Sequence, residues 1–147
     1  MLTNKNYSYL LVTSQFTCIA FLIFLNLPMF SKTLPVMIFL LGIGVFLYTL
    51  LFNRISNFNI IPDIKEDAKL VTTGAYRFIR HPMYFAVLIT MFAPLTNSPN
   101  YINIAICTIL TLTMFLKATK EEKLWHIEST EYKNYMQNTK MIIPFIL

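Results

Sequence analysis

The chain has 147 residues, of which 56% are hydrophobic and only 13% are charged, and its mean hydropathy is +0.57. Soluble domains carry about twice that share of charged residues, so the composition excludes an ordinary soluble domain and predicts a single membrane domain. The formal net charge is +5, but no basic helix or aromatic repeat accompanies it. We interpret this charge as attraction to anionic lipid, and we predict a lipid bilayer and no nucleic acid as partner.

Two apolar segments open the chain, at residues 7–27 and 34–53. About 20 helical residues cross a bilayer core, so both are predicted to span the membrane. A cleaved signal peptide is the alternative for the first segment, but the apolar region is long for one and no small-residue cleavage site follows it. The connection, which carries Lys32, is short, so we predict an antiparallel hairpin in which Gly42 and Gly44 allow close helix approach.

A long polar connection follows, from residue 54 to residue 80. Pro62 marks a turn, and Gly74 permits a backbone conformation that other residues resist. A loop of this length is either functional or disordered, and its spaced aromatics and paired charges favour order. Its charged residues are Arg54, Asp63, Lys65, Glu66, Asp67, Lys69, Arg77 and Arg80.

Two shorter apolar segments come next, at residues 82–96 and 101–117, and Pro94 would kink or end the first. They fit either a thin, tilted hairpin or helices that extend into the interface. From residue 117 to residue 147, charges mix with aromatic side chains, as in a helix that leaves the lipid and lies on its surface. We predict an all-α integral membrane protein with about four transmembrane helices and a C-terminal amphipathic interfacial helix.

Basic residues set the predicted orientation of this multi-pass protein. Placing both termini and the long polar connection in the cytoplasm leaves Lys32 as the only lysine or arginine outside. Four transmembrane helices would put both termini on the same side of the membrane, as this orientation requires.

The junction between the polar connection and the third apolar segment has the chemistry of an anion site. Pro82 suits the first turn of a helix, which places His81 at or beside its cap. Unpaired N–H groups at such a start, flanked by Arg77, Arg80 and His81, can hold a carboxylate. The alternative is that these arginines anchor the topology at the lipid headgroups and that nearby tyrosines form an aromatic belt.

The junction is also part of a longer pattern. Gly74-x-Tyr76-x-x-x-Arg80-His81-Pro82-x-Tyr84 is followed by the pair Glu121-Glu122, by Tyr132-x-x-Tyr135 and by Pro144. Over residues 68–145 this pattern resembles the isoprenylcysteine carboxyl methyltransferase family and the related phospholipid methyltransferases. The resemblance implies one membrane methyltransferase-like domain over residues 1–147 that uses S-adenosylmethionine, with cytoplasmic cofactor regions at 68–84 and 117–135.

The resemblance also implies roles for single residues. Lys69, Leu70 and Val71 would line the adenosine side of the cofactor, and Tyr76 would give ring contact. His81, Pro82, Met83 and Tyr84 would hold its methionine end. Glu121 would meet a positive or hydroxyl group of the cofactor, because a partly desolvated cation needs a partner. Glu122 is the alternative if the alignment slips by one residue.

Two departures from the family pattern bear on this implied site. Where the family has an arginine that orients the substrate carboxylate, four residues before the functional glutamate, this chain has Lys117. The lysine ammonium is a point charge and lacks the planar shape of a guanidinium. Lys117 therefore pairs with one carboxylate oxygen or with a phosphate, or it forms an i,i+4 pair with Glu121. The second departure is Glu128-Ser129, in place of an aromatic-glycine turn that ends the helix.

Other chemistries find little support in the sequence. Cys18 and Cys107 lie inside apolar segments, which favours buried thiols over a disulfide or a metal site, and His126 stands alone. No phosphate-binding glycine loop, zinc spacing or serine triad motif is present, so we expect no metal. The alternatives to a methyltransferase are an NADPH-dependent membrane reductase of the sterol reductase type and a catalytically silent adaptor. The acceptor is expected to be an isoprenylcysteine-like carboxylate or another lipophilic molecule.

Overall fold

The computed structural model describes residues 5–53, 59–64 and 68–146. Its helices are α1 (Lys5–Leu25), α2 (Thr33–Phe52), α3 (Pro82–Asn97), α4 (Tyr101–Glu128) and α5 (Thr130–Asn138), with 3-10 turns at Leu27–Ser31 and Gly74–Arg77. Within these ranges β structure is limited to one parallel bridge between Ile79 and Lys140. The predicted all-α architecture is confirmed. Of the predicted loop charges, Arg54, Lys65, Glu66 and Asp67 lie outside the described residues.

Three helices, α1, α2 and α4, are long and apolar enough to cross a membrane, and α3 is a shorter apolar helix. Large apolar side chains face outward along α1 and α2, among them Phe24 and Leu40. An exposed apolar surface of this kind is favourable against lipid and unfavourable against water. The chain is therefore built as a membrane protein.

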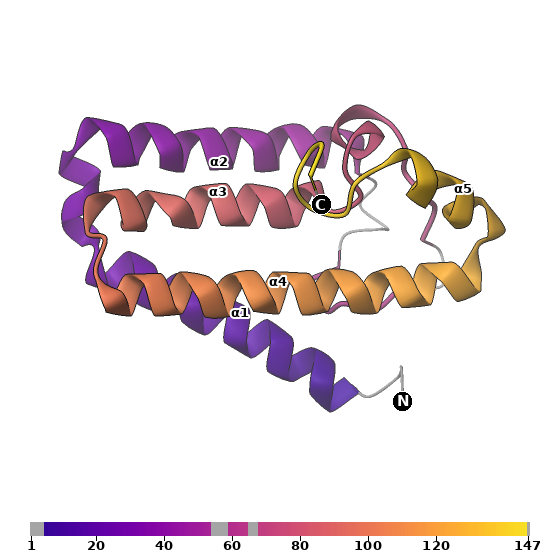
Figure 1. The fold of residues 1–147 in the computed structure, drawn as a ribbon, viewed down its shortest axis with the longest axis horizontal. Coiled ribbons are helices and arrows are strands. Elements are labelled where there is room, and N and C mark those ends of the chain that lie inside the picture. Colours follow the sequence, from indigo (N-terminus) through magenta and orange to yellow (C-terminus); the bar gives the residue numbers. More distant parts are fainter. Residues whose placement is uncertain (1–4, 54–58, 65–67, 147) are drawn as a thin grey trace.

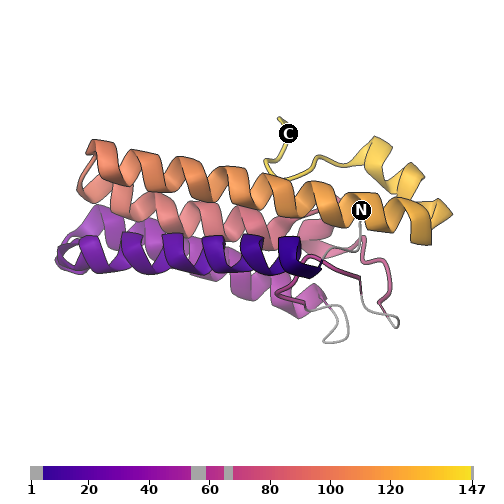
Figure 2. The same cartoon turned by 90° about the horizontal axis from the view of Figure 1, so that it is seen from below.

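Helices α2, α3 and α4 run along the long axis of the molecule (Figures 1 and 2), and α1 crosses α4 obliquely (Figure 1). Helix α2 packs mainly against α3, and α1 packs mainly against α4. The predicted direct pairing of the first two helices is wrong, because α1 and α2 are neighbours in sequence but make little contact. A Cβ on Gly42 would lie 2.6 Å from the backbone nitrogen of Thr90, so the missing side chain lets α2 approach α3 closely. Gly44 faces open space, so it does not serve this contact.

The core between the helices is a small apolar cluster. Cys18 and Leu22 of α1 pack there with Met91 of α3 and with Leu110 and Met114 of α4. The Cys18 thiol is buried as predicted, whereas Cys107 is half-buried. This cluster joins the α1–α4 pair to α3.

One end of the bundle collects the polar segments (Figure 1). Helix α1 begins there, α2 and α4 end there, and α3 starts there, so the connection before α3 meets α5 and the C-terminal tail. Helix α4 ends at Glu128, and the extended Ser129, with φ −140° and ψ 123°, turns the chain into α5. The helix therefore ends here, as in the family pattern, although the chain has no glycine at this point, because any residue can adopt an extended conformation.

The C-terminal tail is tied to the segment before α3. The amides of Arg80 and His81 donate to the carbonyls of Lys140 and Met141, at 2.8 and 2.9 Å, and the Lys140 amide donates to Phe78 at 3.0 Å. Ile142 of the tail is buried. Helix α5 is amphipathic, as predicted, but its buried Tyr132 faces the protein, so α5 is a wall of the polar end.

Candidate cofactor site

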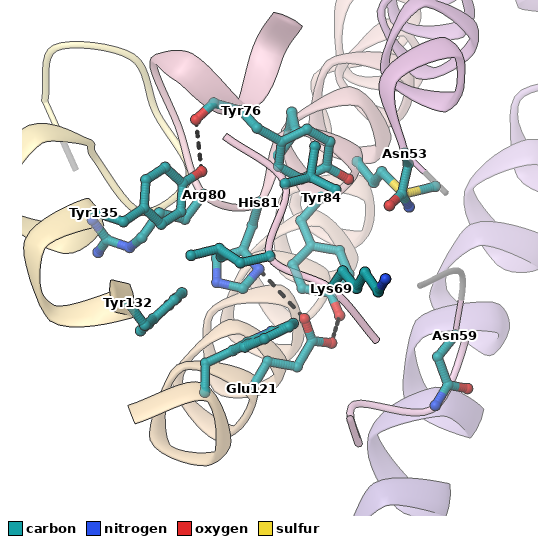
Figure 3. A pocket seen from close by; sticks show the side chains of 15 residues that line it. Asn53, Asn59, Lys69, Tyr76, Arg80, His81, Tyr84, Glu121, Tyr132 and Tyr135 are labelled. Atoms are coloured by element: carbon teal, nitrogen blue, oxygen red, sulfur yellow. Dashed lines mark hydrogen bonds and ion pairs between the residues drawn. The ribbon is translucent and has the colours of Figure 1, made fainter. Parts of the chain in front are cut away.

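A pocket opens at this polar end, between the start of α3, the end of α4, α5 and the connection (Figure 3). The predicted residues Lys69, Leu70, Val71, Tyr76, His81, Pro82, Met83, Tyr84 and Glu121 all line it. Glu122 and Lys117 are not among the lining residues. The remaining members of the lining are Asn53, Asn59, Arg80, Trp125, Tyr132 and Tyr135. The structure thus brings most of the predicted set together, and their role in binding stays a prediction.

The start of α3 places His81 in the pocket. Pro82 is the first helical residue, where its missing N–H costs nothing, and His81 is the capping residue, with φ −121° and ψ 59°. The His81 carbonyl accepts from the amides of Tyr84 and Phe85 at 3.1 and 3.2 Å. With its backbone held in this way, the imidazole is directed toward α4.

Two consecutive glutamates of α4 meet this imidazole. The Nδ1 atom of His81 lies 3.5 Å from Glu121 Oε2, and its Nε2 atom lies 3.4 Å from Glu122 Oε1. The second contact is an ion pair without hydrogen-bond geometry, since Nε2 has no hydrogen-bond partner among the described residues. Burial alone would lower the pKa of His81, but the two carboxylates outweigh it and raise the pKa above its ordinary value.

The two glutamates differ in what else they contact. Glu122 Oε1 also accepts from Arg80 Nε at 2.6 Å, and its side chain is 9% exposed. Glu121 accepts from the Tyr84 hydroxyl through Oε1, and its side chain is 21% exposed toward the pocket. Glu122 is therefore held inside the protein, whereas Glu121 has an open side that can meet a ligand. Of the two alternatives only Glu121 lines the pocket, and which glutamate meets the cofactor stays a prediction.

Arg80, just before the start of α3, contacts α4, α5 and the C-terminal tail, and it does not point toward lipid headgroups. Besides Glu122, its guanidinium donates through Nη1 to the Thr139 carbonyl at 2.5 Å and to the Met136 carbonyl at 3.3 Å. A planar guanidinium suits several acceptors at fixed angles. Arg80 thereby fixes the end of α5 and the following tail against α4 and the start of α3.

Lys117 lies beside the pocket and is committed to other partners. Its side chain is 1% exposed, and its ammonium donates to Gln15 Oε1 at 2.5 Å and to the Ile60 carbonyl at 3.0 Å. The same nitrogen lies 5.1 Å from the centroid of the Tyr84 ring, within cation–π range. Lys117 therefore connects α1 and the connection to α4, and it touches the site through Tyr84.

Aromatic side chains that the sequence prediction left unassigned form the far wall. Trp125 stacks on Tyr132 with ring centroids 5.9 Å apart, and Tyr132 meets Tyr135 edge-on at 5.8 Å. The Tyr135 hydroxyl donates to the Tyr76 carbonyl at 2.6 Å. Trp125 is one helical turn after Glu121, and the tyrosines are three residues apart on an amphipathic helix, so helical spacing could have indicated them.

This donor set fits S-adenosylmethionine. The cofactor combines an ammonium, a carboxylate, a sulfonium and an aromatic base, and the pocket offers the Glu121 carboxylate together with aromatic faces. Two buried polar atoms of lining residues, His81 Nε2 and the Tyr132 hydroxyl, have no hydrogen-bond partner among the described residues. Such atoms are costly unless a ligand or solvent contacts them.

A family model described as the isoprenylcysteine carboxyl methyltransferase family matches residues 34–126 of the chain. The match covers nearly all of α2, then the connection, α3 and most of α4, and it stops before α5. No curated protein matches the chain.

Proposed function

Because the chain belongs to the isoprenylcysteine carboxyl methyltransferase family and is thus a membrane methyltransferase, we propose that it methylates a lipophilic acceptor with S-adenosylmethionine at the cytoplasmic membrane face. The observation that carries this proposal is the Glu121 carboxylate, which stands in a pocket between His81 and Tyr84 at the polar end of an apolar bundle.

Different pocket residues are proposed to contact different parts of the cofactor. Glu121 pairs with its ammonium or a ribose hydroxyl, and its orientation is set by His81 and Tyr84. Lys69, Leu70 and Val71 cover the adenosine side, with Tyr76 as a ring contact. His81 to Tyr84 enclose the methionine end. When bound, S-adenosylmethionine would supply a methyl group attached to a positively charged sulfur. The methyl carbon would bond to the nucleophile as its bond to sulfur breaks, and S-adenosylhomocysteine, a neutral thioether, would be left.

The acceptor is proposed to be a carboxylate of the isoprenylcysteine type or another lipophilic nucleophile. A carboxylate attacks without losing a proton, so the site needs alignment and exclusion of water more than a general base. An apolar groove lined by Val45, Phe85 and Phe145 shares Pro82 with the cofactor pocket. This adjacency of an apolar and a polar site supports a lipophilic acceptor.

Lys117 as the residue that orients the acceptor carboxylate stays a prediction. Two of its three N–H donors already have protein acceptors, Gln15 and Ile60. The contacts favour a positioning role through Tyr84 over a direct grip on the substrate.

Calorimetric titration of the detergent-purified protein with S-adenosylhomocysteine, with NADPH as a second ligand, tests the function. We expect saturable binding of S-adenosylhomocysteine alone. Glu121→Gln should weaken this binding by about tenfold or more, because a charge-assisted contact is lost. Glu128→Gln, on the exposed end of the same helix, is the matched control and should bind like the parent.

Other results of this titration would contradict the proposed function or the proposed site. Binding of NADPH alone would replace the proposal with a reductase of the sterol reductase type. Binding of neither ligand would favour a silent adaptor. Unchanged affinity in Glu121→Gln and in His81→Gln would overturn the assignment of the site.

A further inference from the structure

Tyr132 of α5 has a buried hydroxyl to which no described residue offers a hydrogen bond. The residue is 2% exposed and lines the cofactor pocket, and its hydroxyl oxygen has no hydrogen-bond partner among the described residues. Its neighbour Tyr135, one helical turn away in the same pocket, donates to the Tyr76 carbonyl at 2.6 Å. Within the described part of the chain, the Tyr135 hydroxyl therefore has an acceptor and the Tyr132 hydroxyl has none.

The ring of Tyr132 is fixed, so the hydroxyl cannot turn away to another partner. Trp125 stacks on one face with an interplanar angle of 17°, and Tyr135 meets the ring at 62°. A hydroxyl that is buried without a hydrogen bond costs folding free energy, and natural proteins rarely keep one without a reason.

Two ionic groups whose charges act on Tyr132, Glu122 and Arg80, already have other partners. Glu122 accepts from Arg80 and contacts His81, and the guanidinium of Arg80 is a donor that points to Glu122, Met136 and Thr139. Burial, reinforced by the charge of Glu122, raises the pKa of Tyr132. The phenol accordingly stays protonated at physiological pH and remains a donor.

We propose that Tyr132 is a cofactor-contact residue whose hydroxyl donates a hydrogen bond to an acceptor atom of S-adenosylmethionine in the pocket. This inference rests on the proposed function and adds to its site a residue beyond the family match, which ends at residue 126. Helix α5 then takes part in binding directly and is more than a lid on the polar end.

The test compares Tyr132→Phe with Tyr135→Phe in the full-length protein in detergent. Both variants are titrated with S-adenosylhomocysteine, and the thermal unfolding of each is followed without ligand. For Tyr132→Phe we expect an unchanged or raised Tm, because an unpaired buried hydroxyl is removed, together with affinity weakened by about tenfold. For Tyr135→Phe we expect a lowered Tm, because the hydrogen bond to Tyr76 is lost.

The outcomes separate this inference from the function on which it rests. If the parent binds S-adenosylhomocysteine and Tyr132→Phe binds it equally well, the contact is overturned and the proposed function stands. If Tyr132→Phe instead lowers the Tm without ligand as Tyr135→Phe does, the hydroxyl has a structural partner and the inference is wrong. A parent that does not bind S-adenosylhomocysteine overturns both.

Discussion

At the start of α3, His81 stands between two carboxylates that have separate tasks. Successive residues of a helix point about 100° apart, so Glu121 and Glu122 cannot face the same surroundings. Glu122 is used by Arg80, and Glu121 remains at the pocket. The imidazole contacts both carboxylates, at 3.5 Å from Glu121 and 3.4 Å from Glu122, and therefore links the glutamate at the pocket to the glutamate that Arg80 holds.

The protonation of His81 should make stability depend on pH. Its folded-state pKa is raised by Glu121 and Glu122 against the effect of burial, so the charged pair stabilises the fold below the unfolded pKa of about 6.5. That contribution is lost as the pH rises through the raised folded pKa. We expect the Tm of the unliganded protein to fall above about pH 6.5 relative to His81→Gln.

Thermal unfolding of the parent and of His81→Gln across this pH range checks the prediction. His126→Gln, at the other histidine, which is exposed on α4, is the control and should follow the parent profile. Parallel profiles for the parent and His81→Gln would mean that His81 does not change protonation between folded and unfolded states.

At the scale of the helices, α2 and α3 are held together by a contact that permits no added atom. A Cβ at Gly42 would lie 2.6 and 2.8 Å from the backbone nitrogen and Cα of Thr90, whereas a Cβ at Gly44 would meet nothing within 4 Å. Backbone atoms cannot give way as a flexible side chain can, so the helices must separate to admit a methyl group.

Gly42→Ala should therefore destabilise the protein by about 1–3 kcal/mol, as overpacking does. Gly44→Ala, two residues away on the same helix, is the matched control and should leave stability unchanged or slightly raised. Unfolding in detergent measures both. Equal stability of the two variants would show that α2 and α3 do not approach at Gly42 as described.

A second element-scale feature is a pair of lysines on one face of α4. Lys117 donates to Gln15 and to the Ile60 carbonyl, and Lys120 pairs with Asp63 at 2.5 Å and contacts Ser8. Both lysines thus attach α1 and the segment 59–64 to α4. That segment contributes Asn59 to the pocket, so the attachment shapes one wall of the site.

Lys120→Met should lower stability by about 1–3 kcal/mol, below the value for a fully buried pair because Asp63 is 34% exposed. It should also weaken S-adenosylhomocysteine binding, since the wall of the pocket loosens. Lys123→Met, at an exposed lysine of the same helix, is the control. A double-mutant cycle with Asp63→Asn that shows no coupling would contradict the ion pair.

At the scale of the whole molecule, basic side chains gather at the end of the bundle that carries the pocket. Arg80, Lys117 and Lys120 lie at the end that carries the pocket, whereas Lys32 lies near the short turn at the opposite end (Figure 1). Basic residues tend to be retained on the cytoplasmic side during insertion, so the orientation that we propose has the pocket on the cytoplasmic side. A charged, water-soluble cofactor would have to reach the site from that side.

Cysteine labelling in sealed vesicles tests this orientation. In a background of Cys18→Ala and Cys107→Ala, Gln137→Cys on α5 should react with a membrane-impermeant maleimide only from the cytoplasmic side. Ser31→Cys, in the turn after α1, should react only from the opposite side. The reverse pattern, or labelling of both from one side, would reject the proposed topology.

Local pattern was enough to predict the helices and most of the pocket. Hydropathy over about 20 residues indicates a membrane helix whatever its neighbours are, and Pro82 after His81 marks a helix start by its own stereochemistry. A pattern in the chain predicts a cofactor role for Lys69, Tyr76, His81 and Glu121, and these side chains line one cavity, whereas the equally predicted Glu122 does not. Their role toward the cofactor stays a prediction.

Contacts between distant segments required the tertiary structure. Hydropathy does not say which helix faces which, so only the close approach of Gly42 to Thr90 revealed that α2 pairs with α3 and not with α1. The choice of Glu121 over Glu122 depended on Arg80, and the engagement of Lys117 depended on Gln15, about a hundred residues earlier. The sequence by itself determined the membrane class and indicated most of the residues that line the pocket, because periodicity and motif are local. Only the tertiary structure decided how those residues divide their contacts, because hydrogen bonding and burial are set by partners far apart in the chain.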